Sequence, residues 1–206
     1  MTSLRWPAVL LLLLGACGTS APSLSRNERD RLPRDARQEI FDAENDVIIA
    51  RNRQDEAMDR LRAVREAMDQ LDERQDRSEK RLSSTPGGSS RISALRKVTR
   101  AEQDYLDARQ DVAKTEVEVA AQETITARAR LDLVKQRQLV RIGKEPLASL
   151  KDFEKAIEVE EAKVKEKRAS SLDLRSKAQA SLDAWKAAQE AYADQTRDFD
   201  SGVWIE

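Results

Sequence analysis

Apolar residues recur every seven positions along most of this chain. In residues 33–82, two interleaved series are spaced three or four residues apart. One holds Ile40, Val47, Leu61, Met68 and Leu82, with Gln54 and Gln75 on the same grid; the other holds Ala43, Ala50, Ala57, Val64 and Leu71. A mean spacing of about 3.5 residues between apolar positions is typical of the seam of a left-handed coiled coil. Because Pro33 suits the first turn of a helix, we expect the first long helix to begin there.

Glycines and prolines divide the rest of the chain. Pro86, Gly87 and Gly88 interrupt the first helix, since proline and glycine are costly inside helices. Gly143 is placed to end a second helix, and Pro146 to begin a third. The expected helices span about 33–82, 91–142 and 147–197. The seven-residue series continue through the second and third helices: Val98, Tyr105, Val112, Val119, Thr126, Leu133 and Val140, then Leu150, Ile157, Val164, Ser171, Ala178, Trp185, Tyr192 and Phe199.

Short loops make consecutive helices antiparallel neighbours. The predicted fold is therefore all-α: an elongated antiparallel three-helix coiled-coil bundle, about 75 Å long at 1.5 Å per residue. The bundle should bring Trp185 close to Tyr105 and Met68 near one end. Near the other end, it should bring Phe41, Leu139 and Phe153 together.

Polar and aromatic residues on the third helix's seam lead to two further expectations. Glu160 and Lys167 occupy the second seam position, so the middle of this helix is either weakly packed or paired across the seam. Trp185 and Tyr192 are interpreted as core residues rather than as part of a ligand site.

Composition narrows the function classes. Charged residues make up 36% of the chain and aromatic residues 4%, so there is little apolar surface for a thick core. With a net charge of −1, the chain is not expected to have the broad basic surface that nucleic-acid-binding proteins present. The absence of histidine excludes His-dependent catalytic triads, and with one cysteine the usual metal ligands are missing too. We expect no enzyme activity, no cofactor and no metal site.

The N-terminal segment has the three parts of a secretory signal peptide. Arg5 is followed by an apolar run from Ala8 to Leu14 and by two small residues. The run is shorter than the roughly 20 residues that span a bilayer as a helix. Residues 1–16 are therefore predicted to be an export signal.

Leu14, Gly15, Ala16 and Cys17 resemble the bacterial lipobox, and Cys17 is the only cysteine in the chain. The resemblance implies a lipoprotein: diacylglycerol is attached to the Cys17 thiol, the signal is removed before it, and the new amino terminus is acylated, for example with palmitate. Several acyl chains attach a protein firmly to a membrane. The alternative is cleavage by the ordinary signal peptidase, which would leave a free thiol.

The lipobox also implies a location. Gly18 stands where enteric-type lipoproteins of the inner membrane commonly carry Asp, which favours the outer membrane, facing the periplasm. Residues 17–32 are predicted to be the lipid anchor and a flexible tether, since their first part is rich in small, turn-prone residues. Residues 33–199 form the body, and 200–206 a C-terminal tail.

Trp204 is the candidate partner-binding residue. It lies between Val203 and Ile205 in an apolar cluster outside the helical pattern. It either caps the open end of the bundle or anchors a partner away from the membrane, because aromatic residues often dominate interface energy.

Two function hypotheses follow for the whole chain. The first is a membrane-anchored structural rod or adaptor of the cell envelope, contacting an envelope protein. The alternative is a periplasmic binding or chaperone-like module for an exported client or envelope machine. No nucleic-acid partner is expected, and polar seam residues such as Gln54 can fix the register of a homo-oligomer.

Overall fold

The computed structural model describes residues 24–84, 87–146 and 148–196. Within these residues it has four helices and no strand, which confirms the all-helical class. The short helix α1 spans Arg26–Arg31, and the three long helices are α2 (Arg34–Ser83), α3 (Gly88–Arg141) and α4 (Leu150–Thr196).

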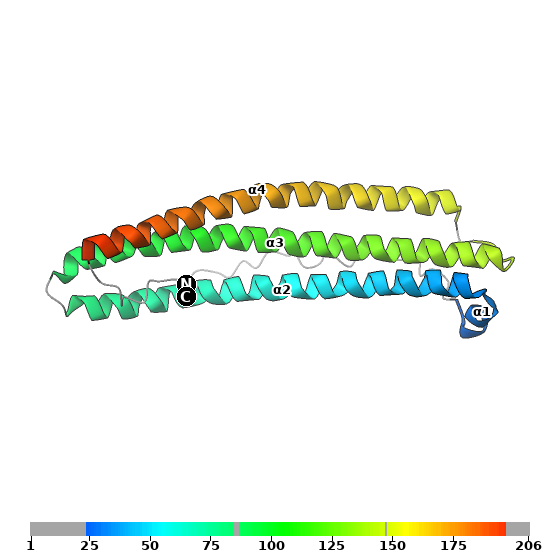
Figure 1. Cartoon of the computed structure of the whole chain (residues 1–206), viewed down its shortest axis with the longest axis horizontal. Coiled ribbons are helices and arrows are strands. Elements are labelled where there is room, and N and C mark those ends of the chain that lie inside the picture. Colours follow the sequence, from blue (N-terminus) through cyan, green and yellow to red (C-terminus); the bar gives the residue numbers. More distant parts are fainter. Residues whose placement is uncertain (1–23, 85–86, 147, 197–206) are drawn as a thin grey trace, which may run out of the picture.

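The long helices lie side by side, with α3 in the middle and each neighbour running in the opposite direction (Figure 1). Helix α3 packs along its length against both α2 and α4, whereas α2 and α4 make almost no contact with each other. The helices therefore form an open layer instead of closing around a common three-sided core. Only near the α2–α3 turn do all three contribute to one apolar cluster, whose buried members are Leu82, Ala94, Leu95, Val98, Trp185 and Tyr192.

The buried face of α2 agrees with the seven-residue pattern. Both of its series face α3, and their members are buried or half-buried. The buried positions include Ile40, Ala43, Val47, Ala50, Ala57, Val64, Leu71 and Leu82. Because the seam is rich in alanine, α2 can approach α3 closely.

Helix α3 has a second buried face that its apolar pattern does not reveal. The predicted series faces α4, while a further seven-residue series lies toward α2: Thr99, Leu106, Ala113, Ala120, Ala127 and Val134. Small and polar residues dominate this series, so it does not stand out as hydrophobic. A helix with two buried faces is the middle element of a layer.

The turns differ from prediction in detail. Helix α3 begins at Gly88, three residues earlier than expected, because Gly87 adopts a left-handed φ of 73° and Gly88 packs against the preceding helix end. A Cβ on Gly88 would lie 2.2 Å from the Leu82 carbonyl oxygen. Gly143 ends α3 as predicted, with a φ of 77°. Its N–H bonds the Val140 carbonyl at 3.0 Å, and the Lys144 N–H bonds the Leu139 carbonyl at 3.0 Å, a Schellman motif.

Pro146 does not start the last helix. Helix α4 begins at Leu150, because the Ser149 side chain accepts a hydrogen bond from the Asp152 N–H at 3.2 Å and so provides the N-cap. Pro33 likewise precedes its helix as the N-cap residue of α2.

The segment before Pro33 differs from the expected flexible tether. Residues 26–31 form α1, with Ser25 and Glu28 in a capping box. Leu24 and Leu32, on either side of α1, are buried against Ala36, Ile40 and Leu139. These apolar anchors hold α1 against the ends of α2 and α3.

One of the predicted contacts between helices is confirmed: Tyr105 and Trp185 stack with ring centroids 5.3 Å apart. Met68, predicted to lie with them, contacts Gln110 instead. At the other end, Leu139 packs with α1 and α2, but Phe41 is 56% exposed, so the predicted group with Phe153 is wrong. The open layer is the reason, since α2 and α4 do not meet.

Candidate functional site

A continuous groove follows one face of the layer, with α3 as its floor and α2 and α4 as its walls. Two adjoining hollows, of about 470 and 560 Å³, share Arg53, Glu123 and Arg168 and so form one feature. The groove exists because α2 and α4 both pack on α3 without touching each other.

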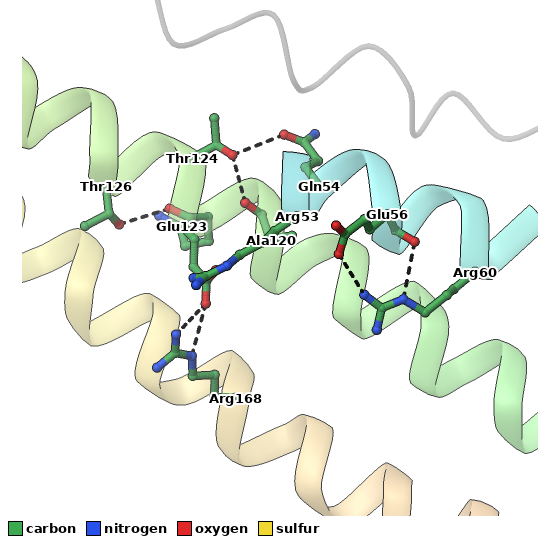
Figure 2. Close-up of polar contacts among 10 residues, drawn as sticks. Arg53, Gln54, Glu56, Arg60, Ala120, Glu123, Thr124, Thr126 and Arg168 are labelled. Atoms are coloured by element: carbon green, nitrogen blue, oxygen red, sulfur yellow. Dashed lines mark hydrogen bonds and ion pairs between the residues drawn. The ribbon is translucent and has the colours of Figure 1, made fainter. Parts of the chain in front are cut away.

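Two glutamates of α3 lie on the floor, each between arginines of both walls. Glu123 pairs with Arg168 of α4 and, at 3.8 Å, with Arg53 of α2. Figure 2 shows Arg53, Glu123 and Arg168 converging from three helices. One heptad away, Glu116 lies 2.7 Å from Arg175 and 3.5 Å from Arg60. The two glutamate side chains are only 17% and 19% exposed, while their arginines are more than half exposed.

The signs of the charges reverse in the other half of the groove. Arg130 of α3 lies 2.6 Å from Glu161, and Arg137 lies 2.8 Å from Glu154. Asp46 of α2 lines the same stretch as Arg130, and Glu39 bonds Gln138, next to Arg137, at 2.7 Å.

We call each set of three facing residues, one from each long helix, a charge layer. In the order α2, α3, α4, ion pairs define two charge layers, Arg60–Glu116–Arg175 and Arg53–Glu123–Arg168. The same seven-residue spacing places Asp46–Arg130–Glu161 and Glu39–Arg137–Glu154 at the next two levels, where the α3 arginines pair with α4 and Glu39 pairs with Gln138 and Arg141. Since like charges would repel in any shifted alignment, these layers favour the observed register and antiparallel order.

Between the second and third of these levels the groove is uncharged at its floor. Thr126 and Ala127 of α3, Ala50 of α2 and Val164 of α4 are buried there. The Thr126 hydroxyl donates to the Gln122 carbonyl of its own helix at 3.0 Å, so its polar group is satisfied internally (Figure 2). Ile49 projects from the α2 wall beside them and is 49% exposed.

This arrangement suits binding better than catalysis. Each floor carboxylate is paired with two guanidinium groups, one from each wall. Among the described residues, no group of three or more His, Cys, Asp and Glu side chains is placed to hold a metal ion. The groove presents charged side chains around a small apolar centre.

Outside the groove, several carboxyl groups with shifted pKa values form ion pairs between different segments of the fold. Arg96, assisted by Gln75, lowers the pKa of Glu79 to about 2 and ties α2 to α3. Lys144, with Ser25, lowers the pKa of Glu28 to about 2 and ties α1 to the loop after α3. Burial raises the pKa of Glu102, although Arg74 lies 2.6 Å away and opposes the shift.

Polar residues on the α3–α4 seam pair across it, one of the two predicted outcomes. Gln122 donates to Glu160, and Lys167 lies 2.6 Å from Glu118. Trp185 and Tyr192 are buried core residues, as expected, with Tyr192 only 1% exposed.

The two candidate site residues from the sequence, Cys17 and Trp204, lie outside the described residues. The charge layers were missed, although their seven-residue spacing is present in the sequence. Charged residues at non-seam positions are typical of solvated surface in a sequence, and only the packing of three helices brings them into pairs.

Comparison of the chain with protein-family models, with curated proteins and with solved structures finds no match in any of the three. None of the helices that the structure describes is long and apolar enough to cross a membrane.

Proposed function

We propose that the mature protein is a lipid-anchored lipoprotein of the bacterial cell envelope that acts as a non-enzymatic rod or adaptor. The observation that carries this proposal is the motif Leu14-Gly15-Ala16-Cys17 directly after an apolar run. Lipid on Cys17 would hold the protein on the outer membrane, with its body in the periplasm.

The shape of the body supports a spacer role. Helix α2 has 50 residues, which is about 75 Å at 1.5 Å per residue. Helix α1 and the α3–α4 loop lie at the end nearer Cys17 in sequence, and the α2–α3 turn lies at the other (Figure 1). A membrane anchor before α1 would therefore place the α2–α3 turn far from the bilayer. We further propose that the long helices pack as an antiparallel coiled coil, which would make the rod stiff.

Metabolic labelling tests the lipid anchor. We expect the full chain, produced in a Gram-negative host, to incorporate labelled palmitate and to sediment with membranes. Cys17→Ala should lose both properties, whereas Thr19→Ala should keep them. Label and membrane attachment that survive Cys17→Ala would overturn the proposal.

The groove favours a second candidate function, a binding or chaperone-like module for an exported client or an envelope machine. A photo-crosslinking residue at Trp204 distinguishes it from the adaptor function in the native cell. One dominant envelope protein in the adducts would support an adaptor whose tail is the contact. Many different adducts would support the binding module, and no adduct would argue that Trp204 caps the body.

A further inference from the structure

We infer that the groove face is the interface of a homodimer, in which two copies meet face to face and run antiparallel. The two-fold axis lies between the two layers of helices, perpendicular to the long axis of the rod. In this arrangement α2 lies along α2 of the second copy, and α4 along α4. The inference does not depend on the lipid anchor. The two α1 ends of this dimer point in opposite directions, so an anchored dimer would lie along the membrane, and the spacer role applies to a single copy.

The charge layers are self-complementary under this symmetry. Arg53 would face Asp46 of the second copy, and Arg60 would face its Glu39. On the α4 wall, Arg168 would face Glu161 and Arg175 would face Glu154 of the second copy. An isologous interface requires this property, because residue i meets residue j in both directions.

The point where the signs reverse is the same on all three helices. It falls between Asp46 and Arg53 on α2, between Glu123 and Arg130 on α3, and between Glu161 and Arg168 on α4. The residues at these midpoints are Ile49 and Ala50, Thr126 and Ala127, and Val164 and Lys165. The two-fold axis would therefore pass over the uncharged floor of the groove, and Lys165 on the α4 wall is the charged residue nearest to it. The floor resembles the apolar centre of known interfaces.

A parallel dimer of the same faces is disfavoured. It would place Arg53 and Arg60 opposite the arginines of the second copy's α4 wall, and the acidic half opposite acidic residues. Like-charge contacts across an interface cost several kcal/mol and select against wrong partners. A foreign helix in the groove would need the same order of charges, whereas a second copy carries it by symmetry.

The area is sufficient for a specific interface. From Glu39 to Arg60, α2 extends about 30 Å at 1.5 Å per residue. Three helices at spacings of 8–10 Å give a width of about 20 Å. The face thus measures about 600 Å² per copy, or about 1,200 Å² in total, the lower end of the range for stable complexes.

Disulfide crosslinking tests the symmetry. In the full chain with Cys17→Ala, Ile49→Cys introduces the only thiol, close to the proposed axis. Mild oxidation should yield a covalent dimer on a non-reducing gel. Ile48→Cys is a matched control, since Ile48 is the same residue type on the same helix and is similarly exposed, 53% against 49%, but does not line the groove. It should not crosslink.

Charge reversal tests the pairing. Sedimentation of the same Cys17→Ala chain should give about twice the monomer mass. Asp46→Arg or Arg53→Asp alone should lower that mass toward the monomer, because each places like charges opposite one another. The double variant should restore the dimer, and circular dichroism would show that all three variants remain helical.

A monomer in sedimentation at micromolar concentrations, with no crosslink through Ile49→Cys, would overturn the inference. So would a dimer that crosslinks through Ile48→Cys and not through Ile49→Cys. A dimer that neither single reversal weakens would also overturn it.

Discussion

Glu102 is an ionisable residue in a buried position. It is a charged residue 6% exposed on α3, and burial raises its pKa above the ordinary value. Arg74 of α2 supplies the compensating charge and a hydrogen bond at 2.6 Å. A buried carboxylate contributes little net stability by itself, but its unpaired form is costly.

The two members of this pair should therefore respond differently to substitution. Arg74→Leu leaves the buried carboxylate without its cation, and we expect a loss of about 1–3 kcal/mol in the free energy of unfolding at neutral pH. Glu102→Gln should cost less, since a neutral amide is easier to bury and can still accept a hydrogen bond from Arg74. Urea unfolding measures both.

The pH dependence gives an internal check on this explanation. A raised pKa means that the folded state binds the Glu102 proton more tightly than the unfolded state. Because Arg74 opposes this shift, its removal raises the pKa of Glu102 further, and the deficit of Arg74→Leu should shrink as pH falls and the buried carboxylate becomes protonated. Equal losses for the two variants, with no dependence on pH, would contradict the explanation.

At the scale of elements, two ion pairs join the apolar anchors in holding α1: Arg29 pairs with Glu44 of α2, and Glu28 pairs with Lys144. Glu28 accepts hydrogen bonds from Lys144 and from the Ser25 backbone N–H, the latter at 2.7 Å. These contacts lower its pKa from 4.5 to about 2. A lowered pKa in the folded state means that the attachment is fully stabilised above pH 4.5 and loses this contribution as pH falls toward 2.

Between pH 4.5 and about 2, we expect the α1 amide resonances in NMR to lose the chemical shifts of the folded state, while those of α2 keep them. In Glu28→Gln the attachment should already be weaker at neutral pH and should not titrate in this range. Asp30→Asn, on the same helix, serves as the control and should behave like the native chain. Loss of α1 and α2 resonances at the same pH would contradict a separate step.

The middle position of α3 explains its unusual composition. Helix α2 needs one buried face, but α3 needs two, and it fills the second with Ala113, Ala120 and Ala127. Small residues there bring α2 close enough for arginines to reach the Glu116 and Glu123 carboxylates. The element is thus built for contacts on two sides rather than for a single seam.

For the whole molecule, the charge layers align the three long helices with one another. Replacing both floor glutamates, Glu116→Arg and Glu123→Arg, would leave two layers of three arginines each. We expect a loss on the order of 2 kcal/mol in the free energy of unfolding, because several ion pairs of up to ~1 kcal/mol are lost and repulsion replaces them. Thermal unfolding followed by circular dichroism measures this.

Salt and a control variant separate charge from packing in that experiment. Added salt should reduce the difference from the native chain, since it screens like-charge repulsion. Glu66→Arg reverses an exposed charge on α2 outside the layers and should have little effect. A deficit that salt leaves unchanged would indicate a packing defect instead.

Much of the architecture could be predicted because it depends on local patterns. Seven-residue spacing identifies the helices and the face of α2 that is buried, and Gly143 marks a helix end that the structure confirms. The start of α4 was placed too early, since a Ser149 N-cap competes with a favourable Pro146 and small differences in capping energy decide. The stacking of Tyr105 on Trp185 was also predictable, because the lengths of two antiparallel neighbouring helices determine which of their residues lie at the same height along the bundle.

The sequence by itself determined the helical class, the helix lengths, the α2 seam and the motif around Cys17, because each depends on residues within a few turns of one another. Only the tertiary structure decided that α3 lies between α2 and α4 in an open layer. The apolar pattern is compatible with either a closed or an open arrangement, since both bury the same seam residues of the outer helices. The choice depends on the second, alanine-rich face of α3 and on charges that meet only after three segments pack together.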